Sequence, residues 1–294
     1  MDIRVEITNT IIDMIEKGAG KWERPWSQVA VHGMPKNFST NRAYTGVNVL
    51  LFWLAAQTRG YERNEWLTFK QAQEIGAKVR KGAKGVMGIF YKMVERTSKN
   101  AEESAEAGDD RLIPLLKPFW VFNVADIDNL PLQPESTTAC FDAIEEAEQI
   151  LKKSGAVIQH GGNRACYSPS MDMIRLPQPM QFKTPADYYG VALHELTHWT
   201  GHDSRLAREF GMRFGDEAYA FEELVAELGS AFVMSDLGLM QNTLDGHASY
   251  AQSWLKVLKN DKTAIFTAAK HASNAYQLIM GSERAIPESM EAGA

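Results

Sequence analysis

The segment HELTH, residues 194–198, constrains the fold of this chain more than any other stretch of its sequence. It places His194 and His198 four residues apart, with Glu195 directly after the first histidine. Side chains at this spacing lie on one face of an α-helix, so the two imidazoles can bind a single metal ion. The adjacent glutamate can then act as a base toward water that the metal activates. The pattern predicts a metal-dependent hydrolase site carried by a helix.

The residues around HELTH predict a complete helix with both ends marked. Thr184 is a favourable N-cap residue, Pro185 suits the first helical position, and Asp187 lies three residues after the cap. Gly201 is a natural residue for the position just beyond the C-terminal end. The motif therefore falls in the body of the helix. The alternative is a helix that buries two ordinary core histidines and exposes a glutamate.

A second helix, expected over residues 216–232, carries the candidates for a third ligand. Catalytic zinc usually binds three protein ligands and one water molecule. The apolar stripe of this helix has helical spacing and comprises Phe221, Leu224, Val225, Leu228 and Phe232. Glu223 and Glu227 share another face with the small residues Ala220 and Ser230, which would let a neighbouring helix approach closely. This arrangement predicts that the two helices meet at the metal.

Two glutamates compete for the role of third ligand. We assign Glu223 as the ligand and Glu227 as the residue that orients a histidine through its second ring nitrogen, and the reverse assignment stays open. Glu222 is expected to point elsewhere. The plain alternative is that all of these glutamates form a solvated charged face. His202 is a further candidate ligand, but it follows Gly201, so a contact at the helix end or a place in the substrate cleft is expected instead.

The combination of a helical HExxH motif and a later glutamate resembles the gluzincin-type zincin metallopeptidases. Within this resemblance, residues 165–177 are similar to the strands that line such a cleft, and Tyr167 is a candidate cleft residue. An edge strand there could bind an extended peptide by strand addition. The resemblance implies zinc as the cofactor, although a site of this composition also accepts manganese. It implies that Glu195 is the general base in hydrolysis of a protein substrate, which the sequence does not identify.

Composition and charge place the chain among ordinary globular proteins. It has 294 residues, of which 45 % are hydrophobic and 23 % charged, which is enough for two domains with proper cores. The two cysteines, Cys140 and Cys166, indicate no disulfide framework, so a cytoplasmic protein is expected. Residues 1–18 form an amphipathic helix rather than a signal peptide, and no apolar run has membrane-spanning length, so no membrane partner is expected.

The charge is unevenly distributed along the chain. Residues 1–94 have a net charge of +6, whereas residues 129–294 have a net charge of −8. Aromatic and basic residues alternate closely in the first part, as expected of a surface that stacks unpaired bases and follows phosphates. Trp53 and Trp120 lie in apolar runs and are expected in the core. The candidate DNA-binding residues are Trp22, Trp26, Arg42, Tyr44, Lys81 and Lys84.

These patterns predict an α+β protein of two domains, residues 1–130 and residues 137–285. Proline and polar residues cluster between them, at residues 130–137. The acidic residues 100–110 are expected to form a solvated loop, and residues 117–127 to form a buried strand that returns to the first domain. A helix ending near Gly155 is expected to open the second domain.

Several segments together resemble one known family. ITNTIIDMIEKG with WERPW, NRAYTGVNVLLFW, WLTFKQAQEIGAKVRKGAKG and FWVFNVADI are similar to the N-terminal domain of the ArdC family of antirestriction proteins. TPADYYGVALHELTHWTGH and FEELVAELGSAF are similar to the metallopeptidase domain that follows it. The resemblance implies a cytoplasmic protein of conjugative plasmids and other mobile elements. It also implies single-stranded DNA binding, protection of incoming DNA from host restriction, and a zincin-type C-terminal domain.

The expected function is therefore an antirestriction protein that binds single-stranded DNA and carries a metallopeptidase domain. One alternative is an intracellular zinc metalloprotease for which DNA binding only sets the location. Another is a DNA-binding protein whose zincin domain is a scaffold without proteolytic activity.

Overall fold

The protein is described from a computed structural model, which describes residues 3–18, 33–95, 112–131, 140–210, 217–239 and 248–281. The elements of the first part are α1 (Ile3–Gly18), β1 (Lys36–Asn37), α2 (Val47–Arg59), β2 (Glu65–Leu67), α3 (Phe69–Glu74), β3 (Lys78–Val79), β4 (Val86–Glu95), β5 (Leu112–Asn123), η2 (Val124–Asp126) and β6 (Ile127–Asp128). Those of the second part are α4 (Cys140–Lys153), β7 (Val157–His160), β8 (Cys166–Ser168), β9 (Met173–Leu176), η3 (Pro179–Gln181), α5 (Pro185–Thr200), α6 (Glu217–Asp236), α7 (Ala248–Asn260) and α8 (Ala264–Met280). This mixture of helices and strands confirms the predicted α+β class.

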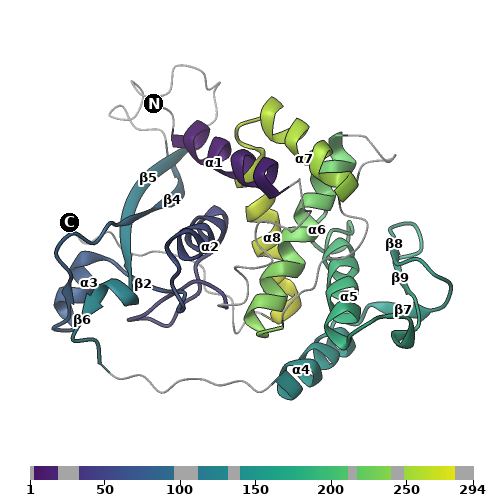
Figure 1. The fold of residues 1–294 in the computed structure, drawn as a ribbon. Helices are drawn as coiled ribbons and strands as arrows, with labels where there is room; N and C mark the ends of the chain where they lie inside the picture. The colour runs from purple at the N-terminus through teal and green to yellow at the C-terminus, as the bar shows by residue number, and fades with distance from the viewer. Residues whose placement is uncertain are drawn as a thin grey trace.

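The first part is built on a four-stranded sheet with the order β1-β2-β5-β4. β4 and β5 form a long antiparallel pair, in register from Val86 opposite Val121 to Glu95 opposite Leu112. β5 also pairs with β2, so a strand does return to this part of the chain as expected, but it ends at Asn123 rather than residue 127 and is exposed on one face instead of buried. α2 packs beside the sheet and lies between the β4–β5 pair and α8 (Figure 1). The acidic residues 100–110 lie outside the described residues.

The helix that carries HELTH begins as its sequence predicts. Thr184 Oγ1 accepts a hydrogen bond from the Asp187 backbone N–H at 3.2 Å, and the Thr184 backbone N–H donates to an Asp187 carboxylate oxygen at 3.1 Å. This reciprocal cap satisfies two backbone donors at the start of α5. The helix ends at Thr200, as expected, but Gly201 has φ −80° rather than a left-handed conformation. Gly201 fits for another reason: a Cβ there would lie 2.8 Å from Arg208 Nη2.

α6 is the central helix of the second part, and it is buried along nearly its whole length. It packs against α5 on one side and α8 on another (Figure 1). Gly229 lies at the close contact with α5, because a Cβ at this position would be 2.6 Å from Thr197 Cγ2. A small residue on α6 therefore allows the two helices to approach closely, as the sequence predicts, although Gly229 makes this contact.

The largest hydrophobic cluster among the described residues includes side chains from both parts of the chain. The rings of Trp53 on α2 and Phe232 on α6 meet edge to face with centroids 5.6 Å apart. The hydroxyl of Thr8 on α1 donates to the Lys262 carbonyl at 2.7 Å, just before α8. α6 also carries the candidate glutamate ligands. The N-terminal half therefore packs against one of the two helices that carry the candidate metal ligands. Most of the expected boundary at residues 130–137 lies outside the described residues, and the two domain ranges stay a prediction.

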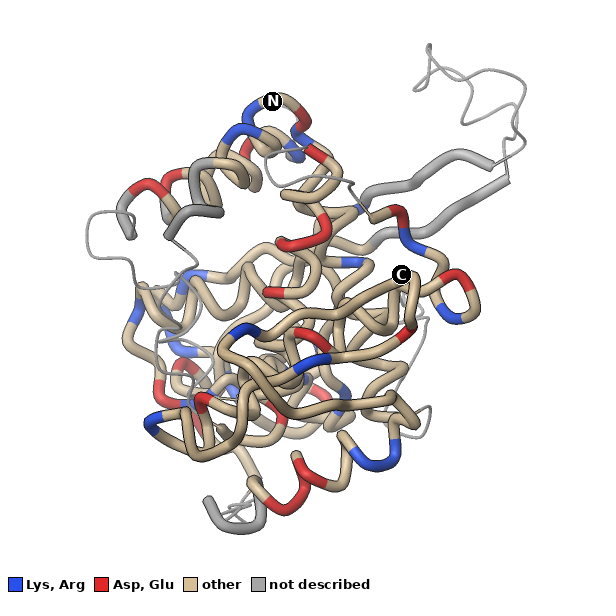
Figure 2. The backbone as a smooth tube through the Cα atoms, turned by 90° about the vertical axis from the view of Figure 1, so that its right-hand side faces the viewer, with Lys and Arg blue, Asp and Glu red and all other residues tan. Residues whose placement is uncertain are grey.

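A small three-stranded sheet lies beside α5, with the order β7-β9-β8. β8 and β9 confirm the strands expected within residues 165–177. α4 confirms the helix expected before Gly155, which has a left-handed φ of +75°. On the face of the molecule that includes these strands, acidic and basic positions are interspersed (Figure 2). Within the described ranges, every helix is too short or too polar to cross a membrane.

Candidate metal centre

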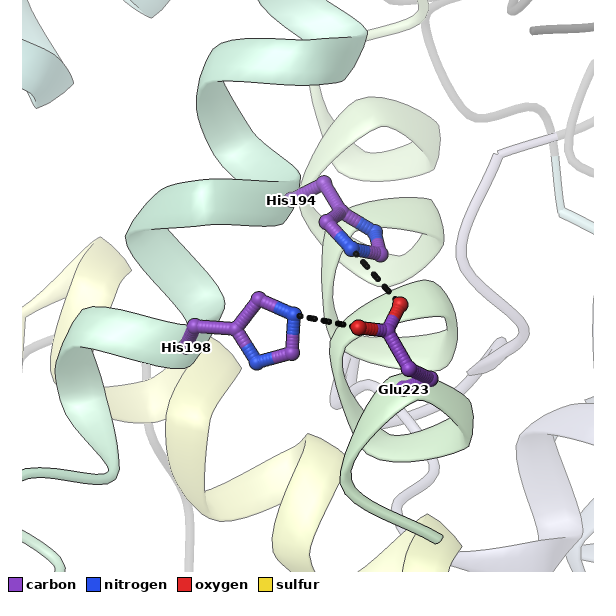
Figure 3. A group of neighbouring side chains, drawn as sticks. All are labelled: His194, His198 and Glu223. Carbon is purple, nitrogen blue, oxygen red and sulfur yellow. Dashed lines mark ion pairs between the residues drawn. The ribbon is translucent and has the colours of Figure 1, made fainter. Parts of the chain in front are cut away.

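Three side chains from two helices converge at the centre of the α5–α6 contact. His194 and His198 project from α5, and Glu223 projects toward them from α6 (Figure 3). His194 Nε2 lies 3.4 Å from one Glu223 carboxylate oxygen, and His198 Nε2 lies 3.6 Å from the other. Each of the three residues offers a ligand atom within 4.8 Å of the others, and all three side chains are buried. The structure therefore brings together the predicted histidine pair and the predicted third ligand.

The spacing of these donor atoms fits a divalent metal. Zinc bound to imidazole nitrogen and carboxylate oxygen at about 2.1 Å, in tetrahedral geometry, separates neighbouring ligand atoms by about 3.4 Å. The two observed nitrogen–oxygen separations of 3.4 and 3.6 Å agree with this value. Two histidines and one carboxylate also leave a coordination position open, which is the composition of a catalytic site. Among the described residues, the group contains Glu223 rather than Glu227 or His202.

The outward-facing ring nitrogens of the two histidines each meet a second carboxylate. His194 Nδ1 lies 3.5 Å from Glu227 Oε2, so Glu227 stays the candidate for orienting this ring. His198 Nδ1 lies 3.1 Å from Glu222 Oε1. The expectation that Glu222 points elsewhere is therefore wrong. Glu222 lies about 100° from Glu223 around the helix, but its long side chain spans that arc to reach the second histidine. With these contacts on the Nδ1 atoms, both Nε2 atoms face the Glu223 carboxylate.

Arg208 holds Glu222 in place, a role that the sequence analysis does not predict. Its guanidinium donates to both Glu222 oxygens, from Nε at 2.9 Å and from Nη2 at 2.8 Å. It also donates to Thr200 Oγ1 at 2.9 Å and to the Thr197 carbonyl at 2.7 Å, both on the last turn of α5. Arg208 is only 6 % exposed, so its charge is neutralised by Glu222 rather than by water. A buried arginine is rare without a partner, but only the structure shows that Arg208 is buried, so no sequence signal marked it.

Nearby carboxylates raise the pKa values of both histidines. Burial lowers the pKa of His194, but the carboxylates of Glu223 and Glu227 outweigh it and raise the pKa to about 9. For His198 burial acts in the same direction, and Glu222 and Glu223 raise its pKa to about 10. Burial opposes ionisation of Glu223, yet both histidines hold its pKa well below its ordinary value. The surrounding carboxylates therefore favour the protonated forms of both histidines.

The raised pKa values of the two histidines predict how the stability of the metal-free protein depends on pH. Both histidine pKa values are raised above the ordinary value of 6.5, so the stabilisation is fully present below pH 6.5. It is lost as the pH rises through about 9 and 10, because the carboxylates then lose their cationic partners. We expect the Tm of the metal-free protein to fall from pH 7 to pH 9, and the Mn(II)-saturated protein to show less of this fall. A metal-free Tm that rises over this interval would contradict the charge balance described above.

The remaining predicted residues of this centre occupy defined positions. Glu195 lies on α5 between the two histidines and is 8 % exposed. His202 is partly exposed, and its Nδ1 lies 2.8 Å from Ser204 Oγ. The Tyr167 hydroxyl donates to an Asp172 oxygen at 2.8 Å, and its ring lies 6.0 Å from that of Phe210. Burial, followed by the Asp172 carboxylate, raises the pKa of Tyr167, so its hydroxyl stays protonated.

The candidate DNA-binding residues fall into three groups. Trp22 and Trp26 lie outside the described residues. Arg42, Lys81 and Lys84 are exposed. The prediction that Tyr44 binds DNA is wrong. Tyr44 is 8 % exposed and its ring packs against Phe52 and Phe119, so its faces are not available to a base.

The prediction that Trp120 lies in the core is also wrong. It was expected in the core because it lies in an apolar run, but 55 % of its surface is exposed. Strand alternation explains the difference. Its neighbour Val121 faces the core and is fully buried, so Trp120 faces the other side of β5.

Comparison with known proteins agrees with both halves of this description. Residues 1–122 match the N-terminal domain of anti-restriction factor ArdC, and residues 145–271 match a zincin-like metallopeptidase domain. The metal-free crystal structure of the antirestriction ArdC protein from the R388 plasmid is 37 % identical, with a TM-score of 0.77. The alignment covers 95 % of this chain and 97 % of that protein. The chain belongs to the ArdC family of antirestriction proteins.

This ArdC-family chain is also similar to another solved structure and to several proteins of known sequence. The Mn(II)-bound structure of the same R388 protein is 36 % identical over 97 % of this chain and 98 % of that one, with a TM-score of 0.76. An uncharacterized protein y4eC of Sinorhizobium fredii is 38 % identical over 92 % of this chain and 89 % of its own length. Two proteins named DNA primase TraC from Escherichia coli are also 38 % identical, but the chain spans only 20 % and 27 % of their lengths.

Proposed function

We propose that this protein binds single-stranded DNA, protects incoming DNA of a mobile element from host restriction, and carries a metal-dependent peptidase centre. The observation that carries the catalytic part is the convergence of His194, His198 and Glu223 at metal-ligand spacing beside Glu195. The DNA-related part is supported by membership of the ArdC family and by the net charge of +6 over residues 1–94. A cytoplasmic location fits a protein that acts on entering DNA.

The candidate metal is divalent, and zinc and manganese both suit the donor set. His194, His198 and Glu223 would hold it, while Glu227 and Glu222 orient the two imidazoles. When bound, such a metal polarises a scissile carbonyl and makes water easier to deprotonate. The Glu195 carboxylate would accept a proton from the attacking water and deliver it to the leaving amine. Tyr167 remains a candidate residue of the substrate cleft, with its hydroxyl donating to Asp172.

The edge of the small sheet offers a place for an extended peptide substrate. β8 pairs with β9 on one side only among the described strands, and it contacts the metal helix α5. Its Tyr167 ring adjoins Phe210, whose ring in turn lies 6.5 Å from that of His198. A peptide added to the open edge of β8 would therefore run close to the metal centre.

The test uses the full-length protein and a Glu195→Ala variant. We expect wild-type protein to bind single-stranded DNA and to protect a transferred plasmid in a restricting host. We expect Glu195→Ala to lower metal-dependent cleavage of fluorescent casein by about 10²- to 10⁴-fold, with single-strand affinity unchanged. Wild-type protein that neither protects nor binds single strands at low salt would overturn the proposal.

The same variant decides between the two alternative roles of the peptidase domain. If protection is lost while DNA binding persists, proteolysis is the protective activity and DNA only sets its location. If protection persists at the wild-type level, the zincin domain acts as a scaffold.

A further inference from the structure

Two large aromatic side chains are exposed on the N-terminal half of the described structure. Trp120 on β5 and Phe69 at the start of α3 expose 55 % and 53 % of their surfaces. The other large hydrophobic side chains that the structure describes as exposed, such as Met180, are aliphatic or contain sulfur. Exposed aromatic rings cost solvation free energy, and where they gather they mark interaction surfaces.

The two rings belong to one continuous surface. Phe122, two residues after Trp120 on the same face of β5, meets Phe69 edge to face at 6.5 Å. Gly85 lies close to both Trp120 and Phe122, because a Cβ at position 85 would lie 3.2 Å from Trp120 Cδ1 and 3.5 Å from Phe122 Cζ. We call Phe69, Phe122 and Trp120, with Gly85 beside the last two rings, the aromatic strip. A side chain at position 85 would crowd the Trp120 ring and contact Phe122.

Positive charge surrounds the aromatic strip. Lys84 directly precedes Gly85, and Lys70 follows Phe69. Both lysines are exposed, and neither forms an ion pair with another described residue. The guanidinium of Arg59 donates to the backbone carbonyls of Lys84 and Gly85, so another cationic group lies beside the strip. An apolar partner would gain nothing from these charges, whereas a phosphate backbone would.

We propose that the aromatic strip is the surface on which unpaired bases of single-stranded DNA stack, with Lys84 and Lys70 following the phosphates. This inference rests on the proposed single-strand binding and assigns it to particular residues. Unpaired bases expose flat faces that stack on aromatic rings, and neighbouring lysines neutralise the adjoining phosphates. In a duplex the base faces are covered, so the strip favours single strands.

The test measures binding of an oligo-dT strand to the full-length protein at low salt, by fluorescence anisotropy. We expect Trp120→Ala and Phe69→Ala each to weaken binding by about 5- to 150-fold. Trp120→Phe keeps a ring and should retain most of the affinity. Met180→Ala is the matched control, because it removes a side chain that is 90 % exposed on the other half of the chain, and no change is expected.

An abasic strand of the same length separates stacking from charge. It keeps the phosphates but has no bases, so Trp120→Ala should not weaken its binding, whereas Lys84→Ala should weaken binding of both strands. Wild-type protein that fails to bind oligo-dT would overturn single-strand binding and this assignment together. Wild-type binding that Trp120→Ala and Phe69→Ala leave unchanged, with folding confirmed by circular dichroism, would overturn the assignment alone.

Discussion

Replacing Glu223 with glutamine is expected to weaken divalent metal binding by more than about 100-fold, the upper range for residues that only orient a ligand. Glu223 contributes the carboxylate that both Nε2 atoms face, so its loss removes one of three protein ligands and the negative charge at the metal. Isothermal titration of the metal-free protein with Mn(II) or Zn(II) measures the effect. The change is isosteric, which limits its effect on the packing of α5 against α6.

Glu227→Gln is the matched control for this prediction. Glu227 lies one turn further along α6 and faces His194 Nδ1 rather than the metal position. A glutamine at this position can still accept a hydrogen bond from the imidazole, so the loss should not exceed about 100-fold. If Glu227→Gln abolished binding and Glu223→Gln did not, the roles of the two glutamates would have to be exchanged.

Replacing Arg208 with methionine is expected to destabilise the metal-free protein by about 3–5 kcal/mol. The variant leaves the buried Glu222 carboxylate without its cation and removes four hydrogen bonds that tie residue 208 to α5 and α6. The free energy of unfolding in urea measures the loss. Arg208→Lys keeps the charge but not the fork-shaped geometry, so it should fall between methionine and wild type.

Arg80→Met serves as the control for the loss of an arginine–carboxylate pair. Arg80 Nε lies 2.7 Å from Asp128, but both side chains are more than half exposed, so little change in unfolding is expected. Arg208→Met should also weaken metal binding, because Glu222 would no longer be held against His198. A variant as stable as wild type, with unchanged metal affinity, would contradict the role given to Arg208.

The candidate metal centre was predictable in outline, because helical spacing decides which side chains share a face. Residues four apart face one direction, so HELTH and the Glu223–Glu227 pair define two faces that can meet. The capping residues Thr184 and Asp187 fix where α5 begins, since their effect is local. The choice between Glu223 and Glu227 depends on the relative placement of two helices, which no local pattern specifies.

Glu222 and Arg208 could not be assigned from spacing. Glu222 reaches His198 by the length of its side chain, and Arg208 reaches Glu222 because the chain reverses after Gly201. The reversal is held by the Arg208 backbone N–H, which donates to the Gly201 carbonyl at 2.8 Å. Such tertiary contacts link residues whose separation in sequence has no regular period.

Trp120 and Tyr44 show the same limit in the N-terminal half. Trp120 lies in an apolar run and is exposed, whereas Tyr44 lies in a polar stretch and is buried. For Trp120, composition does not reveal which face of β5 meets α2. Tyr44 is buried because its ring packs on Phe52 and Phe119, which are distant in sequence.

Anomalous diffraction from crystals soaked with Mn(II) or Zn(II), recorded at the metal absorption edge, tests the metal centre most directly. We predict one strong peak on the α5–α6 contact, about 2.0–2.2 Å from His194 Nε2, His198 Nε2 and a Glu223 oxygen. A peak ligated by Glu227 or His202 in place of Glu223, or no peak beside His194 and His198, would contradict this account.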